Sequence, residues 1–96
     1  MNKPDLYDAS SPEMFNLRLE AKEQCHTFNE LRPKQLEEKN EIILKLFGKV
    51  RGKFEITAPF WCDFGYNIEI GDGFYANHNL TILDTAPIKF GKNVFI

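Results

Sequence analysis

The apolar residues that follow Pro12 recur at spacings of three and four, which is the period of one face of an α-helix. Ser11 can cap this helix, and Pro12 suits its first turn because that position needs no N–H donor. The pair Arg32–Pro33 ends the pattern. The apolar stripe consists of Met14, Leu17, Ala21, Cys25 and Phe28.

A second helical pattern starts near Lys34 and runs through QLEEKNEIILKLF. Gly48 stands just past its end, where glycine readily adopts the left-handed conformation of a helix C-terminus. Two short helices bury little surface, so we expect this helical hairpin to pack against another part of the chain. The apolar side of the second helix is predicted to hold Leu36, Ile43, Leu46 and Phe47.

After Phe54 the helical period gives way to a step of six residues, in a segment rich in β-branched and aromatic side chains. Two inward positions in every six residues are typical of a parallel β-helix, in which successive coils stack side chain on side chain. The register resumes two residues late at Ile88 and Phe90, which predicts a bulged corner at Asp84–Pro87. The alternative, an antiparallel meander, would need strict alternation and a turn every 8–12 residues or so. The two inward registers are Ala58, Phe64, Ile70, Ala76 and Ile82, and Cys62, Ile68, Phe74, Leu80 and Ala86.

These patterns predict an α+β fold, with a helical hairpin in residues 1–54 followed by the first coils of a parallel β-helix in residues 55–96. Phe60 and Trp61 are expected to pack on the first coil or on the hairpin. Repeat folds need about three repeats and a cap to be stable alone. We therefore expect residues 1–96 to be unstable alone, with an open apolar edge at Ile96, and interpret them as a truncated protein, a fragment or one part of a split protein.

Charge and composition exclude several classes of partner. Twelve Lys and Arg residues against fourteen Asp and Glu residues give a net charge of -2 and a pI near 5.6, which does not favour binding to phosphate backbones. No apolar run approaches the roughly 18 residues of a membrane span. The N-terminal MNKPDLYDASS lacks the apolar core of a signal peptide. We therefore expect no nucleic-acid or membrane partner and a cytoplasmic location.

Metal chemistry finds little support in the sequence. Cys25 and Cys62 lack the C-x-x-C spacing of metal and redox motifs, and we expect two free, buried or half-buried thiols. Only two His are present, whereas a carbonic anhydrase of the β-helix type would need three His ligands. The sequence therefore predicts no metal site.

The segment PFWCDFGYNIEIGDGFYANHNLTILDTAPIKFGKNVFI resembles the opening coils of the maltose and galactoside O-acetyltransferases, a branch of the hexapeptide-repeat acyltransferases. The preceding LYDASSPEMFNLRLEAKEQCHTFNELRPKQ resembles their helical N-terminal domain, so the similarity extends from Leu6 to Ile96. The resemblance implies a left-handed parallel β-helix, assembled as a homotrimer, that transfers an acetyl group from acetyl-CoA to a sugar hydroxyl between neighbouring subunits. It implies no metal, and it places most of the acetyl-CoA site in later coils outside this segment.

In this family the general base is a His of a T-x-x-H-P motif, one coil beyond the counterpart of GKNVFI. His26 falls on the first helix, and His78 occupies a position where the family also has Phe or Tyr, which implies that proton transfer is not its task. The resemblance thus implies a sugar O-acetyltransferase of which residues 1–96 are an acceptor-side portion, inactive alone. The alternative is a non-catalytic assembly or capping module of a split or degenerate acetyltransferase.

The resemblance also assigns acceptor-side residues. Asn77 corresponds to a residue that contacts the substrate and whose amide stabilises the charged transition state. Asp63 and Tyr75 correspond to residues that contact the sugar by hydrogen bonding and by stacking. A structural role at a corner or on the surface is the alternative for each of these side chains. The contacts that depend on the exact alignment are Asp84 or Thr85 in one place and Asp8 or Ala9 in another.

Overall fold

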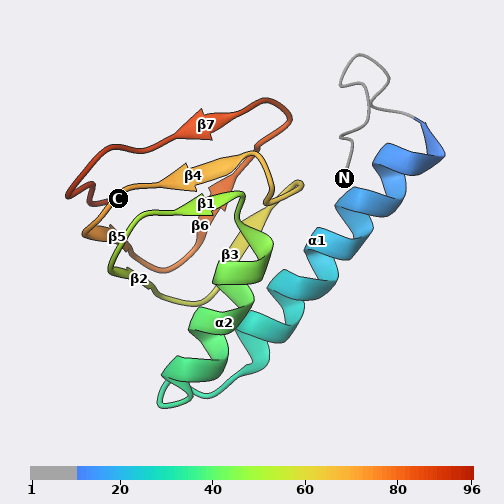
Figure 1. Ribbon diagram of the computed structural model, residues 1–96. Coiled ribbons are helices and arrows are strands. Elements are labelled where there is room, and N and C mark those ends of the chain that lie inside the picture. The colour runs from blue at the N-terminus through green and yellow to red at the C-terminus, as the bar shows by residue number, and fades with distance from the viewer. Residues whose placement is uncertain (1–10) are drawn as a thin grey trace.

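The computed structural model describes residues 11–96, in which two helices precede a series of short strands (Figure 1). Helix α1, Pro12–Glu30, begins where the sequence predicts, because the Ser11 hydroxyl accepts a hydrogen bond from the Met14 N–H at 3.2 Å. Neither of the helices in this part of the chain is long and apolar enough to cross a membrane. Four members of the predicted apolar stripe are buried, which are Met14, Ala21, Cys25 and Phe28, and the fifth, Leu17, is half-buried.

Helix α2, Leu36–Leu46, begins two residues after the predicted start near Lys34. The prediction that Leu36 lies on the apolar side is wrong, because its side chain is 60% exposed in the first turn. Lys39 occupies the inward position instead, with its ammonium nitrogen 4.9 Å from the centre of the Phe28 ring. The charge does not prevent this burial, because the alkyl stem covers apolar surface and the aromatic face attracts the cation.

All strand pairs are parallel, which confirms the parallel arrangement predicted from the six-residue step and excludes an antiparallel meander. The chain passes in turn through three small sheets, β1–β4–β7, β2–β5 and β3–β6. Figure 1 shows the strands stacked on one side of the two helices. The strand bounds are β1 Lys49–Val50, β2 Phe54–Ile56, β3 Phe60–Cys62, β4 Ile68–Ile70, β5 Phe74–Ala76, β6 Leu80–Ile82 and β7 Ile88–Lys89.

One circuit through the three sheets takes twenty residues, since Phe54 pairs with Phe74 and Phe60 pairs with Leu80. Three steps of six would fall two residues short of this length. The two extra residues lie where the chain leaves the β3–β6 sheet, because β6 begins at Leu80 and β7 begins only at Ile88. Every circuit therefore has one long corner.

The long corners of the two circuits are stacked. The later one is the corner predicted at Asp84–Pro87, between β6 and β7. Its counterpart at Asp63–Asn67, between β3 and β4, escaped prediction because the apolar Phe64 keeps the six-residue step unbroken. Ala86 was predicted to point inward and is exposed, because a residue in a long corner is not enclosed between strands.

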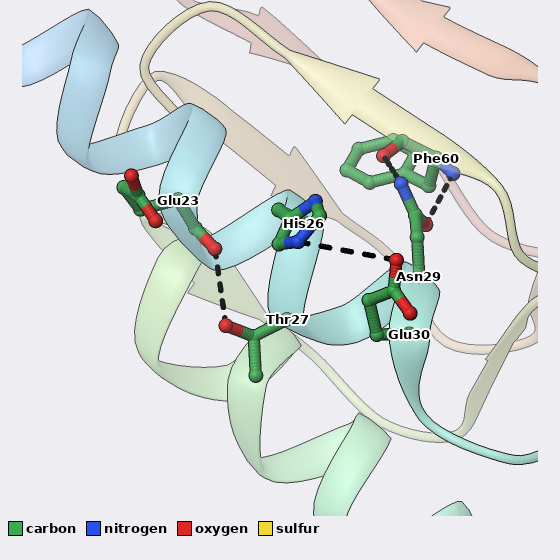
Figure 2. Close-up of polar contacts among 6 residues, drawn as sticks. All are labelled: Glu23, His26, Thr27, Asn29, Glu30 and Phe60. Carbon is green, nitrogen blue, oxygen red and sulfur yellow. Dashed lines mark hydrogen bonds and ion pairs between the residues drawn. The ribbon is translucent and has the colours of Figure 1, made fainter.

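The helices and the strands enclose one hydrophobic core. Cys25 of α1 and Ile43 of α2 belong to the same buried cluster as the inward residues of the strands. Asn29 of α1 fastens the helix to β3, because its Oδ1 accepts a hydrogen bond from Phe60 N at 2.8 Å and its Nδ2 donates one to Phe60 O at 3.1 Å (Figure 2). In its sheet β3 pairs only with β6, so Asn29 satisfies backbone groups on the other edge of the strand.

Candidate functional site

Asp84 follows β6 and is completely buried in the long corner of the second circuit. Its Oδ1 accepts hydrogen bonds from Asp63 N at 3.1 Å and Phe64 N at 2.9 Å. Its Oδ2 accepts from Gly65 N at 2.8 Å and Asn67 N at 3.3 Å. Burial raises the pKa of Asp84, while the surrounding N–H donors act in the opposite direction. The carboxylate therefore anchors the corner below it and faces the interior.

The corner Asp63–Asn67 is also fixed from the side of the helices. Gly65 has φ 85°, a conformation that favours glycine, and an added Cβ would lie 2.5 Å from Leu46 Cδ1 of α2. The rings of Phe64 and Tyr66 are in contact, with centroids 5.4 Å apart, and burial raises the pKa of Tyr66. The corner is thus packed closely against α2 at Gly65.

Asp63 is half-buried at one wall of a cleft of about 250 Å³ on the outer side of β3 and β6. Trp61 lies two residues before it on the outer side of β3, and both residues line the cleft, so a carboxylate and an indole share one surface. Trp61 was predicted to pack on the first coil or on the hairpin, although its alternation with the apolar Phe60 and Cys62 indicates an outward side chain. The residues that line the cleft are Lys22, Trp61, Cys62, Asp63, Thr81 and Leu83.

Tyr75 and Asn77 come together at the end of β5. The Tyr75 hydroxyl donates a hydrogen bond to Asn77 Oδ1 at 3.3 Å. The Tyr75 ring lies on the outer side of β5 against the exposed Phe95, with ring centroids 5.5 Å apart. Asn77 N donates to Ile96 O at 3.0 Å, and the Asn77 side chain is exposed.

The predicted acceptor-side residues form two groups rather than one. Asn77 precedes β6, whereas Thr85 follows it and is exposed in the next corner. Asp63 lies in the corner stacked against that of Thr85, at the same end of the β3–β6 sheet. Strand β6 therefore separates the Asn77 group from the Asp63 group within one chain. Asp8 lies outside the described residues.

Neither histidine lies in a strand. His26 is exposed on α1, with Nε2 3.9 Å from Glu30 Oε1 one helical turn later (Figure 2). His78 is exposed in the corner between β5 and β6, next to Asn79, whose φ of 67° marks a tight turn. Among residues 11–96, no three His, Cys, Asp or Glu side chains are grouped so that they could hold a metal ion.

The two cysteines are adjacent, which the sequence did not indicate. Cys25 Sγ of α1 lies 3.8 Å from Cys62 Sγ of β3, and both are free and buried. The hydrogen bond between the thiols and their burial raise the pKa of Cys62. A protonated thiol without solvent access is a poor nucleophile.

We expect neither thiol to react with iodoacetamide at pH 8 in the folded protein, because alkylation requires an exposed thiolate. Mass spectrometry should find both Cys25 and Cys62 unmodified after a reaction time that labels a free cysteine completely. Addition of denaturant is the matched control and should give modification of both. Rapid labelling of either residue without denaturant would contradict the buried contact between α1 and β3.

Comparison with known proteins identifies the relatives of this chain. A family model described as the maltose acetyltransferase hexapeptide capping motif matches residues 1–52. The chain is 47% identical over 93 residues to a protein of Saccharomyces cerevisiae. This match covers 96% of the chain and 47% of the yeast protein. It is also 37% identical over 79 residues to the galactoside O-acetyltransferase of Escherichia coli, in a match that covers 82% of the chain and 39% of that enzyme. The chain thus spans about half the length of the curated relatives it matches.

Solved structures with the same arrangement of helices and strands are also acetyltransferases. A maltose O-acetyltransferase from Clostridium difficile superposes with a TM-score of 0.88 at 31% identity, over 91% of this chain and 46% of that one. A hexapeptide-repeat acetyltransferase from Vibrio cholerae, complexed with acetyl-CoA, has a TM-score of 0.83 at 35% identity, over 93% of this chain and 48% of the other. Residues 11–96 therefore share the fold of these acetyltransferases and match about half the length of each.

Proposed function

Because this chain belongs to the family of the maltose acetyltransferase hexapeptide capping motif, we propose that the protein which carries it transfers an acetyl group from acetyl-CoA to a sugar hydroxyl. The observation that carries this proposal is the similarity, at 35% identity and a TM-score of 0.83, to an acetyltransferase complexed with acetyl-CoA. The sugar acceptor is supported by relatives named as galactoside and maltose O-acetyltransferases. Acetyl-CoA acts as co-substrate, and we assign none of its contacts to this segment.

We further propose that the parallel strands form the beginning of a left-handed β-helix, with residues 1–54 as the helical domain and residues 55–96 as its coils. The family motif, which ends at residue 52, supports a division near this point. The three sheets visited in constant order support the helical winding. We propose the cytoplasm as the location, since two free thiols suit a reducing compartment.

The proposed roles follow the two groups of residues. Asn77 donates its amide N–H to the oxyanion that forms when the sugar oxygen attacks the thioester carbonyl. Tyr75 offers a ring for stacking, and Asp63 and Thr85 hydrogen-bond to sugar hydroxyls. Since β6 separates these groups within one chain, a site that uses both is best formed between neighbouring copies in a homotrimer.

The other two predicted sugar contacts have a different basis. We retain Asp8 as a proposed contact on the family resemblance alone. We give Asp84 an internal role, since both of its carboxylate oxygens accept backbone N–H groups in a buried position. Its support for the Asp63 corner links it to the acceptor side without direct contact.

Acetyl transfer also needs a base that removes the proton from the attacking hydroxyl. We propose that this base is neither His26, which is exposed on α1, nor His78, which is exposed in a corner. A polypeptide of residues 1–96 is therefore expected to be inactive by itself. Association of this polypeptide with a second chain, in a complex that transfers no acetyl group, would support the alternative of a non-catalytic assembly or capping module.

Replacement of Asn77 by alanine is expected to lower kcat for acetyl transfer about 100-fold, because one preorganised oxyanion donor is lost. The whole protein that carries this chain is assayed with acetyl-CoA and a panel of maltose, galactosides and glucose, with release of free CoA as the signal. Asn40→Ala, which removes an exposed amide from α2, is the matched control and should retain full activity. A wild-type protein without turnover on any sugar would refute the proposed function. Equal activities of the Asn77 and Asn40 variants would refute only the role of Asn77.

A further inference from the structure

We propose that the cleft on the outer side of β3 and β6 is a subsite for one sugar ring of the acceptor, with Trp61 as its stacking platform. This inference rests on the proposed function in that the acceptor is a sugar. It adds a residue that determines which sugars are accepted. The subsite holds a ring next to the one that receives the acetyl group, so that Trp61 favours disaccharides over monosaccharides.

Trp61 is placed by the alternation of its strand. Its neighbours Phe60 and Cys62 are buried, whereas Trp61 points outward and is 39% exposed. In the parallel register it lies directly beside Thr81 of β6. The indole therefore presents a large apolar face to solvent in a row of side chains that the sheet holds in fixed positions.

The chemistry of the cleft matches a carbohydrate. A pyranose has an apolar face that stacks on an aromatic ring, and a rim of hydroxyls that both donate and accept hydrogen bonds. Asp63 supplies an acceptor, Lys22 supplies a donor, and the Thr81 hydroxyl can do either. Trp61 and Asp63 are two residues apart and line the same cleft, so a ring stacked on Trp61 has its rim within reach of Asp63.

The size of the cleft limits its occupant. Its volume of about 250 Å³ is below the roughly 300–1,000 Å³ of pockets for drug-sized ligands. One sugar ring is thus the appropriate ligand, and a nucleotide or a longer glycan would extend beyond the walls. The mixture of an acid and a base on the rim also disfavours a ligand with a strong charge of either sign.

The platform is preorganised on both sides. Before Trp61, the backbone of Phe60 is held by the side-chain amide of Asn29 (Figure 2). After it, Asp63 N donates to the buried carboxylate of Asp84 and to Ile82 O at 3.3 Å. A site whose backbone is fixed before binding loses little conformational entropy when the ligand arrives.

Tryptophan fluorescence provides a direct test, because Trp61 is the one tryptophan of residues 1–96 and comparison with Trp61→Tyr shows which part of the signal it contributes. Titration of the protein with maltose should change the fluorescence emission of Trp61 in a saturable manner, whereas sorbitol, a polyol without a ring, should not. Asp63→Ala should weaken the maltose response about tenfold. Asp72→Asn, which alters a carboxylate at a different corner, is the control and should leave the response unchanged. Absence of any saturable change in the wild type would overturn the proposal, as would a crystal structure in which side chains of a neighbouring subunit fill the cleft itself.

Acetyl-transfer kinetics test specificity separately. Trp61→Ala should raise KM for maltose about tenfold without changing kcat or KM for acetyl-CoA, and should leave KM for glucose unaltered. Trp61→Tyr should restore most of the preference, and Phe15→Ala, which removes an exposed ring from α1, is the control. An equal rise in KM for both sugars would overturn the inference. Fluorescence-detected binding without any acetylation would instead refute the proposed function and leave the subsite standing.

Discussion

Replacing Asp84 with alanine is expected to lower the free energy of unfolding by about 3–5 kcal/mol, because four backbone N–H groups lose their acceptor in a buried place. The donors are at Asp63, Phe64, Gly65 and Asn67, between 2.8 and 3.3 Å from the carboxylate oxygens. No solvent reaches this position, so water cannot replace the lost carboxylate without opening the corner. Urea unfolding followed by circular dichroism gives the difference.

Asp72→Ala is the matched control, because it also removes a carboxylate from a corner. In the wild type, Asp72 Oδ1 accepts one hydrogen bond, from Lys53 N at 2.8 Å, and Asp72 is exposed. We expect a loss of about 0.5–1.5 kcal/mol there. If Asp84→Ala does not fold, Asp84→Asn can be measured instead. It keeps one acceptor oxygen, so its loss of free energy of unfolding should lie between those expected for Asp84→Ala and Asp72→Ala. Equal losses for Asp84→Asn and Asp72→Asn would contradict the anchoring role of Asp84.

Replacing Asn29 with alanine is expected to cost about 2–4 kcal/mol, because both backbone groups of Phe60 lose their partner at once. Phe60 itself is fully buried, so its backbone lies next to the core and has little access to water. Asn29→Asp should be destabilising as well, since a carboxylate can still accept from Phe60 N–H but places its second oxygen against Phe60 O. Chemical denaturation of the three proteins measures both effects.

Asn16→Ala serves as the control for Asn29, because it removes the same side chain from an exposed position of α1. Alanine has the higher helix propensity, so this variant should be neutral or slightly more stable. Hydrogen exchange should further show faster exchange at Phe60 in Asn29→Ala and unchanged exchange in Asn16→Ala. Protection of Phe60 that survives the loss of Asn29 would show that the two hydrogen bonds of the Asn29 side chain are dispensable.

Two parts of the fold could be predicted from local periodicity. The spacing of Met14, Ala21 and Phe28 indicated a helix with one buried face, and the structure confirms that face. The six-residue step indicated parallel strands, and every observed pair is parallel. The errors arose where the period was ambiguous: Phe64 concealed a long corner, and Ala86 was small enough to be assigned inward although it is exposed.

The candidate site was less predictable, because its geometry depends on contacts between distant positions. Cys25 and Cys62 carry no spacing signal, and yet their sulfur atoms are 3.8 Å apart. Asp84 has the polarity of a ligand-binding residue, and only the stacking of one corner on another shows that it faces inward. Trp61 has a large aromatic side chain of the kind that is usually buried, and its exposure depends on which side of β3 the helix α1 covers.

The sequence by itself determined which elements form and which of their faces are buried, because a helix or a six-residue coil repeats its inward positions at short, fixed intervals. The tertiary structure alone decided which residues meet. Asn29 reaches Phe60 and Asp84 reaches the Asp63 corner across 31 and 21 residues of chain. Such contacts depend on the exact length of each corner and on how the helices lie against the first strands, and no local pattern of hydrophobic residues encodes either.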